Sequence, residues 1–154
     1  MTGKLSPEQL EYLSHARVAR LATTNKKNSI QIVPVVFASA GDRIYFVMDR
    51  KTKRKGKEPR RIKNITETGK ASLLVDKYSE NWEDLFFLLL DCKAKVIGRG
   101  VEIKEKKLAA AKLKQKYPQY RDGGYFPENL DQTIFVRLQP QKAVFWRNLR
   151  KSLV

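Results

Sequence analysis

The sequence is poor in the residue types that build disulfide bonds and metal centres. Its 154 residues include one cysteine, Cys92, and one histidine, His15. A single cysteine excludes an intramolecular disulfide, and one residue of each type cannot supply a zinc site of the usual His/Cys kind. A Ser–His or Cys–His nucleophile would have to use His15. We interpret His15 instead as a half-exposed histidine at the end of a first helix.

Long apolar runs and nucleotide-binding motifs are also missing. The longest uninterrupted apolar run, Leu85–Leu90, is far too short to cross a bilayer, so no transmembrane helix and no membrane partner are predicted. The first residues, Met1 to Lys4, carry no apolar signal-peptide stretch, which leads us to expect a cytoplasmic protein. Neither a GxGxxG nor a Walker A pattern is present. The acidic stretch 76–84 is typical of a polar turn rather than of a catalytic carboxylate pair.

Acidic residues are half as frequent as basic ones. The chain has 32 Lys and Arg against 16 Asp and Glu, a formal net charge of +16, and an isoelectric point of about 10.1. Such a surplus favours anionic partners, which include nucleic acids, phosphate-bearing cofactors and acidic membranes. A solvated basic surface without any partner is the alternative.

Short strand-like runs dominate the remainder of the chain. Ser6, Pro7 and Gln9 form a capping-box pattern that predicts the start of a first helix. Pro34 interrupts the second run and indicates an edge strand or a bulge, because proline cannot donate to a sheet ladder. Strands are predicted at Ala16–Thr23, Ile30–Phe37, Arg43–Met48, Ala71–Tyr78, Phe86–Ile103 and Thr133–Trp146, with a helix over Glu102–Tyr117. The pattern predicts one mainly β domain over residues 1–154, a small barrel of six antiparallel strands with peripheral helices.

A basic loop follows the third predicted strand. Residues 49–63 hold nine basic residues against two acidic ones, a net charge of +7. The segment leads into Arg60-Arg61-Ile62, which resembles the first turn of a helix. Backbone N–H groups at a helix N-terminus, together with arginine side chains, form a phosphate site. A disordered solvated loop and a nucleic-acid-binding patch are the alternatives, although the loop lacks the interleaved aromatic residues that stack on bases.

The ordered combination of these segments resembles a known family. The segments are RVARLATT (17–24), IVPVVF (32–37), GDRIYF (41–46), the basic loop, RRIKNI (60–65) and ASLLVD (71–76). They are similar to the pyridoxamine 5′-phosphate oxidase-like split β-barrels. The stretch VDKYSENW (75–82) narrows the resemblance to the branch of deazaflavin-dependent oxidoreductases. The resemblance covers about residues 8 to 146.

The resemblance implies a cofactor site and its residues. The cofactor would be FMN or the deazaflavin coenzyme (F-420). The strand around Val33, Pro34 and Val35 would lie along the isoalloxazine ring, and Val47 and Met48 would lie under the ribityl chain. The phosphate would be held by Lys53, Arg54, Arg60 and Arg61. Family members build each site from two subunits, so Phe87 and Trp146 of a partner would complete the pocket.

Three departures separate the chain from pyridoxamine phosphate oxidases proper. Gln31 stands where those enzymes have an arginine, and Cys92 stands where a glycine is usual. The C-terminal arginine/histidine segment that binds pyridoxal phosphate in those enzymes is missing after Trp146. These differences argue against vitamin B6 oxidation.

The resemblance therefore implies an FMN- or deazaflavin-dependent oxidoreductase that transfers hydride to a small-molecule substrate. The alternatives are a non-catalytic nucleic-acid-binding module and a protein that sequesters a flavin or heme cofactor.

The apolar run Leu85–Leu90 predicts a homodimer. A strand this rich in leucine and phenylalanine, without alternation, requires cover on both faces. The interior of one small barrel can cover only one of them. A second copy of the chain is expected to cover the other.

Overall fold

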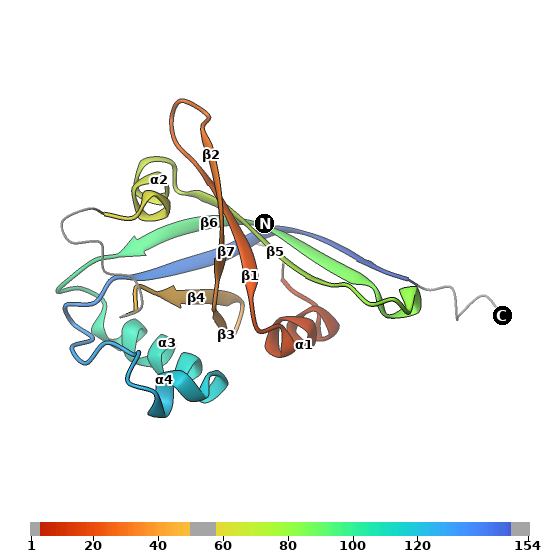
Figure 1. Ribbon diagram of the computed structural model, residues 1–154. Helices are drawn as coiled ribbons and strands as arrows, with labels where there is room; N and C mark the ends of the chain where they lie inside the picture. The colour runs from red at the N-terminus through yellow and green to blue at the C-terminus, as the bar shows by residue number, and fades with distance from the viewer. Residues whose placement is uncertain (1–3, 50–57, 149–154) are drawn as a thin grey trace.

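The protein is built around a curled antiparallel sheet with helices packed around it (Figure 1). The computed structural model describes residues 4–49 and 58–148. The strands are β1 (Ala19–Thr24), β2 (Ile30–Val35), β3 (Ala38–Ala40), β4 (Arg43–Val47), β5 (Lys70–Lys77), β6 (Phe86–Ile97) and β7 (Phe135–Arg147). The helices are α1 (Pro7–His15), α2 (Arg60–Thr68), α3 (Ile103–Lys116) and α4 (Pro118–Asp122), with one 3₁₀ turn, η1 (Trp82–Asp84).

The strand order is β2-β1-β5-β6-β7-β4-β3, and all the neighbouring pairs are antiparallel. The prediction of a mainly β split barrel is confirmed, but the described residues form seven strands rather than six. The additional strand is the three-residue β3, which pairs with β4 directly after the second predicted strand ends. Pro34 lies in β2 at an edge of the sheet, as its missing N–H predicts.

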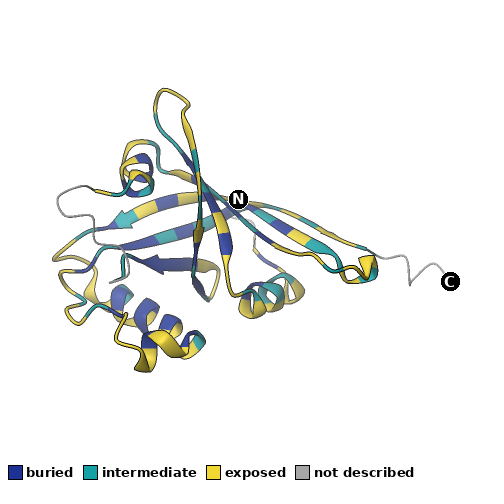
Figure 2. Ribbon diagram, in the orientation of Figure 1, coloured by how far each residue is buried: buried dark blue, intermediate teal, exposed yellow. Residues whose placement is uncertain are grey.

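One apolar core fills the inside of the curled sheet. The register places Leu21 of β1 beside Leu73 of β5, and Leu73 beside Leu90 of β6, and all three side chains are buried. Residues of β4 and β7 close the same core from the other side, among them Phe46 and Val136. Figure 2 shows the resulting alternation of buried and exposed residues along these strands.

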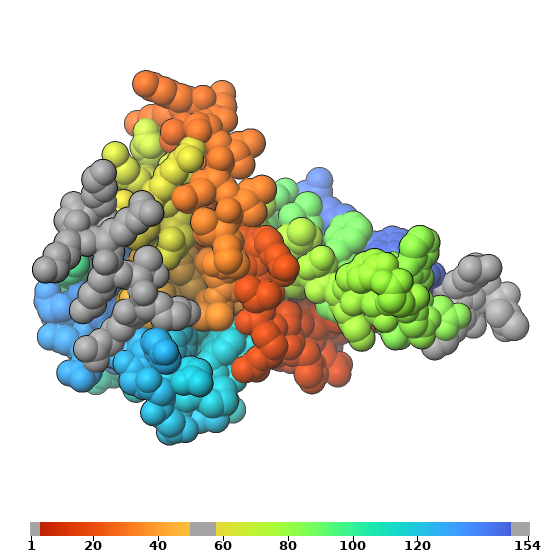
Figure 3. All heavy atoms as spheres, viewed as in Figure 1, coloured from red at the N-terminus to blue at the C-terminus, as the bar shows by residue number. Residues whose placement is uncertain are grey.

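The far ends of β5, β6 and β7 extend beyond the barrel as an arm, here residues 75–87 and 144–147. The arm carries η1 at its tip and projects to one side of the barrel, and α1 packs against its base through Tyr12 and Phe86 (Figures 1 and 3). A β-bulge precedes the arm: Asp91 pairs with Lys142 and Cys92 pairs with Pro140, so that Gln141 is an extra residue in β7. On the arm side of the bulge, Phe145 turns inward against Tyr12 of α1.

The helices begin and end where local chemistry dictates. The predicted capping box of α1 is present: Gln9 N donates to Ser6 Oγ at 3.1 Å, and Ser6 N donates to Gln9 Oε1 at 2.9 Å. Helix α2 ends at Gly69, whose φ of 66° lies in the left-handed region that favours glycine. In the part of the chain that the structure describes, no helix combines the length and apolarity of a membrane span.

A carboxylate of helix α3, Glu105, binds the helix to the outside of the barrel. Glu105 accepts hydrogen bonds from Tyr45 Oη at 2.6 Å and from Arg137 Nη1 at 2.8 Å. Burial alone would raise the pKa of Glu105, but these hydrogen bonds and the charges of Arg137 and Arg43 hold it below its ordinary value. A second apolar cluster, which includes Val47, Ala109 and Leu113, fills the space between the helix and the sheet.

Candidate functional site

The N-terminus of α2 presents two adjacent arginines, Arg60 and Arg61. No side chain caps this helix, and its first turn contains no acidic residue. The hydrogen bonds of the first turn begin with the N–H groups of Ile62 and Lys63, both of which donate to Pro59 O. The N–H groups at the start of a helix attract anions, and no acidic side chain of the first turn competes for them here.

Arg61 carries an unsatisfied donor beside the end of β4. Its Nη2 lies 3.6 Å from Met48 Sδ, a weak acceptor. Its Nε is buried and has no hydrogen-bond partner. Burial lowers the pKa of the guanidinium, and the nearby carboxylate of Asp49 opposes this by raising it. A buried donor without a partner is costly in a protein, and a bound anion would satisfy it.

Arg60 extends in a different direction, toward the turn between β1 and β2. Its Nη2 donates a hydrogen bond to the hydroxyl of Ser29. Asn25 shapes this turn by accepting from the backbone N–H groups of Lys27 and Ser29, at 2.9 and 3.0 Å. Since Arg60 is exposed and Arg61 is partly buried, the two arginines present different surfaces to a ligand.

A second orphaned polar atom lies on β2. Gln31 Oε1 is buried and, like Arg61 Nε, has no hydrogen-bond partner. Gln31 pairs with Thr23 of β1, and the Thr23 hydroxyl accepts a hydrogen bond from Asn64 of α2 at 3.0 Å. The two unsatisfied atoms therefore belong to elements that meet through the Thr23–Asn64 contact. Sequence reasoning noted Gln31 only as a departure from the family pattern, and a polar residue on the inner face of a strand was the signal that could have identified it.

The residues predicted for the isoalloxazine ring divide between the two faces of β2. Val33 and Val35 pair with Leu21 and Ala19, which are both fully buried. Pro34 is exposed on the opposite face. The structure therefore brings Val33 and Val35 to one side of the strand and Pro34 to the other, so that only the strand's backbone is common to all three.

The residues predicted for the ribityl chain and the phosphate also separate. Val47 is buried in the outer cluster beneath α3, whereas Met48 packs on the barrel core and contacts Arg61. Lys53 and Arg54 lie outside the described residues. Of these residues, Met48 and Arg61 are the ones that the structure brings into contact.

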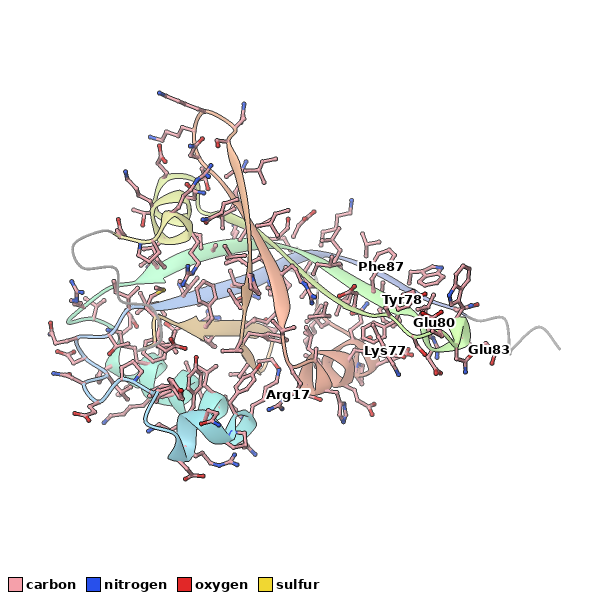
Figure 4. All side chains as sticks on the ribbon, viewed as in Figure 1. Arg17, Lys77, Tyr78, Glu80, Glu83 and Phe87 are labelled. Carbon is pink, nitrogen blue, oxygen red and sulfur yellow. The ribbon has the colours of Figure 1, made fainter. Side chains whose placement is uncertain are left out.

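Phe87 and Trp146 form a stacked pair on the arm. Their ring centroids lie 6.0 Å apart with an interplanar angle of 22°. Strand β6 reaches the end of α2 at Ala94, whose N–H donates to Gly69 O at 2.9 Å. Phe87 precedes Ala94 by seven residues on β6, so the two residues are about 23 Å apart at the usual rise of a strand. Figure 4 accordingly shows Phe87 on the arm, far from α2, so one protomer does not bring the aromatic pair to Arg61.

The outer face of the sheet carries apolar side chains on β2, β5, β6 and β7, with Arg20 of β1 among them. The register aligns Pro34, Arg20, Leu74, Leu89 and Val144 in one row across β2, β1, β5, β6 and β7. Ile30 and Ile32 on β2 are 67% and 66% exposed, and Val144 and Trp146 on β7 are 41% and 45% exposed. We call this surface the outer sheet face. Exposed apolar surface of this continuity is typical of an interaction site.

Other chemistry-bearing residues do not form a second centre. Within residues 4–49 and 58–148, no group of three His, Cys, Asp or Glu side chains could hold a metal ion. His15 lies exposed at the end of α1, with its Nδ1 2.9 Å from Glu11 O. Cys92 is buried, and burial raises the pKa of its thiol to about 12. These positions suit structural roles.

Comparison with solved structures identifies the fold over nearly the whole chain. The heme storage protein HutZ of Vibrio cholerae is 16% identical with a TM-score of 0.64, and the match covers 94% of this chain and 95% of that one. A conserved hypothetical protein from Mycobacterium tuberculosis is 14% identical with a TM-score of 0.70, over 97% and 89% of the two chains. A FAD-binding protein from Mesorhizobium loti is 17% identical with a TM-score of 0.64, over 93% and 95%.

Comparison at the level of sequence gives the family. No curated protein sequence matches this chain. The family model described as pyridoxamine 5′-phosphate oxidase matches residues 5–147, a range that spans the sheet, the site at α2 and the arm. The chain therefore belongs to the pyridoxamine 5′-phosphate oxidase family.

Proposed function

We propose that the protein is a homodimeric flavin-binding oxidoreductase that holds FMN or the deazaflavin coenzyme at two sites shared between its subunits. The observation that carries this proposal is the partly buried Arg61, whose Nε has no partner at the open N-terminus of α2. A terminal phosphate or phosphodiester would pair with that donor and with the free N–H groups of the first turn.

The cofactor supplies the redox chemistry, which is hydride transfer, and the protein supplies position and electrostatics. Met48 would contact the cofactor beside Arg61. Gln31 would offer its unsatisfied carbonyl oxygen to a donor on the flavin ring, such as a ring N–H. No acid–base side chain is needed for hydride transfer itself.

A homodimer would account for two features of the structure. It would cover the outer sheet face, whose exposed isoleucines and aromatic residues a monomer leaves in water. It would also carry the arm of one subunit toward the α2 of the other. Within one chain, Phe87 lies about 23 Å along β6 from Ala94, where that strand meets the end of α2. A two-fold axis would generate two such sites.

Cofactor storage without turnover is the second candidate. The similarity to a heme storage protein over 94% of this chain favours it, because the same barrel serves storage in that protein. Absorbance spectra of the purified protein after addition of FMN, the deazaflavin coenzyme or heme would separate the cofactors. Reduction of bound flavin by NADH or NADPH, followed by its reoxidation by an acceptor, would separate turnover from storage.

Mixing two inactive variants tests the shared site. Arg61→Ala removes the phosphate ligand, and Phe87→Ala combined with Trp146→Ala removes the aromatic pair. Each homodimer should bind FMN weakly. Subunit exchange by random mixing should restore about a quarter of the wild-type sites, because one site of each heterodimer is intact and half of the dimers are heterodimers. If the wild type binds FMN but the mixture recovers no sites, each site lies within one subunit.

A further inference from the structure

Two positive side chains share one aromatic ring where α1 and α3 end. Arg17 Cζ lies 4.7 Å from the centroid of the Tyr117 ring, and Lys116 Nζ lies 5.4 Å from the same centroid. Within residues 4–49 and 58–148, neither of these cations forms an ion pair with a carboxylate. We propose that Lys116 is a reactive amine and a modification site, which accepts an acyl group from an acyl phosphate. The proposal does not depend on which cofactor the protein binds.

The ammonium group of Lys116 lies in a poorly hydrated position. Its Nζ donates to Leu13 O of α1 at 3.1 Å and lies 3.8 Å from the centroid of the Phe37 ring. Burial of this kind disfavours the charged form of a lysine, and one carbonyl oxygen and a ring face replace only part of its hydration shell. Lys116 is partly rather than fully buried, which leaves a path for a small reagent.

The charges that face this end of α3 are positive. Arg17, which follows the end of α1 (Figure 4), donates from Nη2 to Lys116 O at 3.0 Å. Arg121 of α4 donates to two carbonyl oxygens in the last turn of α3. The hydroxyl of Tyr117 stays neutral, because burial raises its pKa. The ionisable side chains of α1 line a cavity beside Phe86 of the arm, and they are Glu8, Glu11 and His15.

This environment makes the neutral amine available near physiological pH. Burial, together with the charge of Arg17, lowers the pKa of Lys116 to about 8. At pH 7.5 roughly a quarter of such amines are neutral, whereas only about one in a thousand is neutral at the ordinary lysine value of 10.5. The neutral form alone has the lone pair that attacks a carbonyl carbon. Desolvation and a neighbouring cation are the two conditions that activate lysine nucleophiles in enzymes.

An acyl phosphate suits this amine because its anionic phosphate is attracted to the guanidinium of Arg17. The lone pair of Lys116 Nζ attacks the carbonyl carbon, so that a C–N bond forms and the C–O bond to the phosphate breaks. Inorganic phosphate leaves with the electron pair of that bond, and the nitrogen releases one proton to solvent. The product is a neutral amide in place of the ammonium group.

Labelling of the wild-type protein with acetyl phosphate tests the proposal. Peptide mass spectrometry gives the acetylation rates of Lys116 and of Lys112, an exposed lysine one turn earlier on α3, between pH 6.5 and pH 10. We expect Lys116 to react at least about tenfold faster than Lys112 at pH 7.5, since its larger neutral fraction outweighs its lower basicity and partial burial. A rate for Lys116 that is equal to or below that of Lys112 at pH 7.5 would overturn the proposal.

Arg17→Gln separates activation of the amine from simple exposure. The substitution removes the neighbouring charge and keeps a donor for Lys116 O. Acetylation of Lys116 at pH 7.5 should slow about threefold or more, because more of the amine is protonated, and Lys112 should react as before. If Lys116 reacts equally fast in the variant and in the wild type, the two cations do not form an activated site.

Discussion

Asn64 of α2 donates a hydrogen bond of 3.0 Å to the hydroxyl of Thr23 in β1, and both side chains are buried. This is a polar contact inside an otherwise apolar contact surface, where Ile62 and Ile65 of the same helix pack on the barrel core. Apolar contacts allow a helix to slide, whereas a buried hydrogen bond fixes its register. The pair therefore fixes the position of Arg61 at the helix start.

Replacing Asn64 with alanine should lower the free energy of unfolding by about 1–3 kcal/mol, because the Thr23 hydroxyl loses its buried partner. FMN affinity should fall as well, since α2 would no longer be fixed. Urea denaturation and flavin titration measure the two effects. A double-mutant cycle with Thr23→Val provides the control: if the two substitutions destabilise the protein additively, the hydrogen bond has no stabilising role.

Arg61 should contribute more to cofactor binding than the basic residues around it. Charge-assisted hydrogen bonds contribute about 1.5–3 kcal/mol, so Arg61→Ala should weaken FMN binding about 10- to 100-fold and leave riboflavin binding unchanged. Arg60→Ala should cost less, because the side chain is exposed and already bonded to Ser29. Lys55 belongs to the basic loop and lies outside the described residues; its replacement with alanine is expected to cost about 0–1 kcal/mol, the usual contribution of a surface charge contact.

Fluorescence titration of these three variants at one fixed ionic strength measures the contrast. Equal losses for Arg61→Ala and Lys55→Ala, with equal salt slopes, would indicate a diffuse electrostatic patch. In that case nucleic-acid binding would become the better hypothesis.

Ile32→Glu should convert the dimer to a monomer. Ile32 is 66% exposed on the outer sheet face, so a glutamate there costs the isolated subunit little but places a charge in the proposed interface. Sedimentation velocity at micromolar concentration should show wild-type dimers and variant monomers. Leu108→Glu on α3, where the leucine is 49% exposed, is the control and should stay dimeric. A wild-type monomer would exclude the shared site.

The stabilising role of Glu105 should depend on pH. The pKa of Glu105 is depressed in the folded protein, so its contribution is complete above the ordinary value of 4.5 and is lost as the pH falls through the depressed value. Glu105→Gln should therefore destabilise the protein by about 1–3 kcal/mol at pH 7, and the difference from wild type should shrink on acidification below that ordinary value. Thermal unfolding between pH 7 and pH 3 measures it, and a difference independent of pH would contradict the ionic role.

Local chemistry made much of the fold predictable. The capping box placed the start of α1, and the periodic leucines and alanines over 102–117 located α3 (Ile103–Lys116). Strand β3 and helix α4 were not predicted. Ala38–Ala40 carries too few side chains of strand type to stand out, and Pro118–Asp122 is anchored by Tyr120, whose hydroxyl donates to Asp49 in a distant part of the chain. Tertiary contacts of this kind leave no local pattern.

The candidate site was predictable in its chemistry but not in its geometry. Paired arginines at a predicted helix start indicated a phosphate site; the structure places both arginines at the start of α2, and the phosphate site stays a prediction. Other features of the site depend on which face of a strand each residue occupies. They are the orientation of Val47 toward α3, the unsatisfied oxygen of Gln31 and the position of Asp49. That choice is set by strand register and by packing against α3 and α4, which appear late in the chain.

The bulge at Gln141 lets β7 carry one residue more than its pairing with β6 uses. Between Phe135 and Pro140 the even-numbered residues of β7 face the core, and beyond Gln141 the odd-numbered ones do, while the residues of β6 opposite them keep one regular alternation. Trp146 thus faces outward beside Phe87, and Phe145 faces inward against Tyr12. Deleting Gln141 would leave these orientations unchanged, because Pro140 and Lys142 already pair with the adjacent residues Cys92 and Asp91. Deleting a residue between 142 and 145 with the bulge retained would instead turn Trp146 inward. Evolution can therefore change the chain length at position 141 more freely than in the rest of this part of the strand.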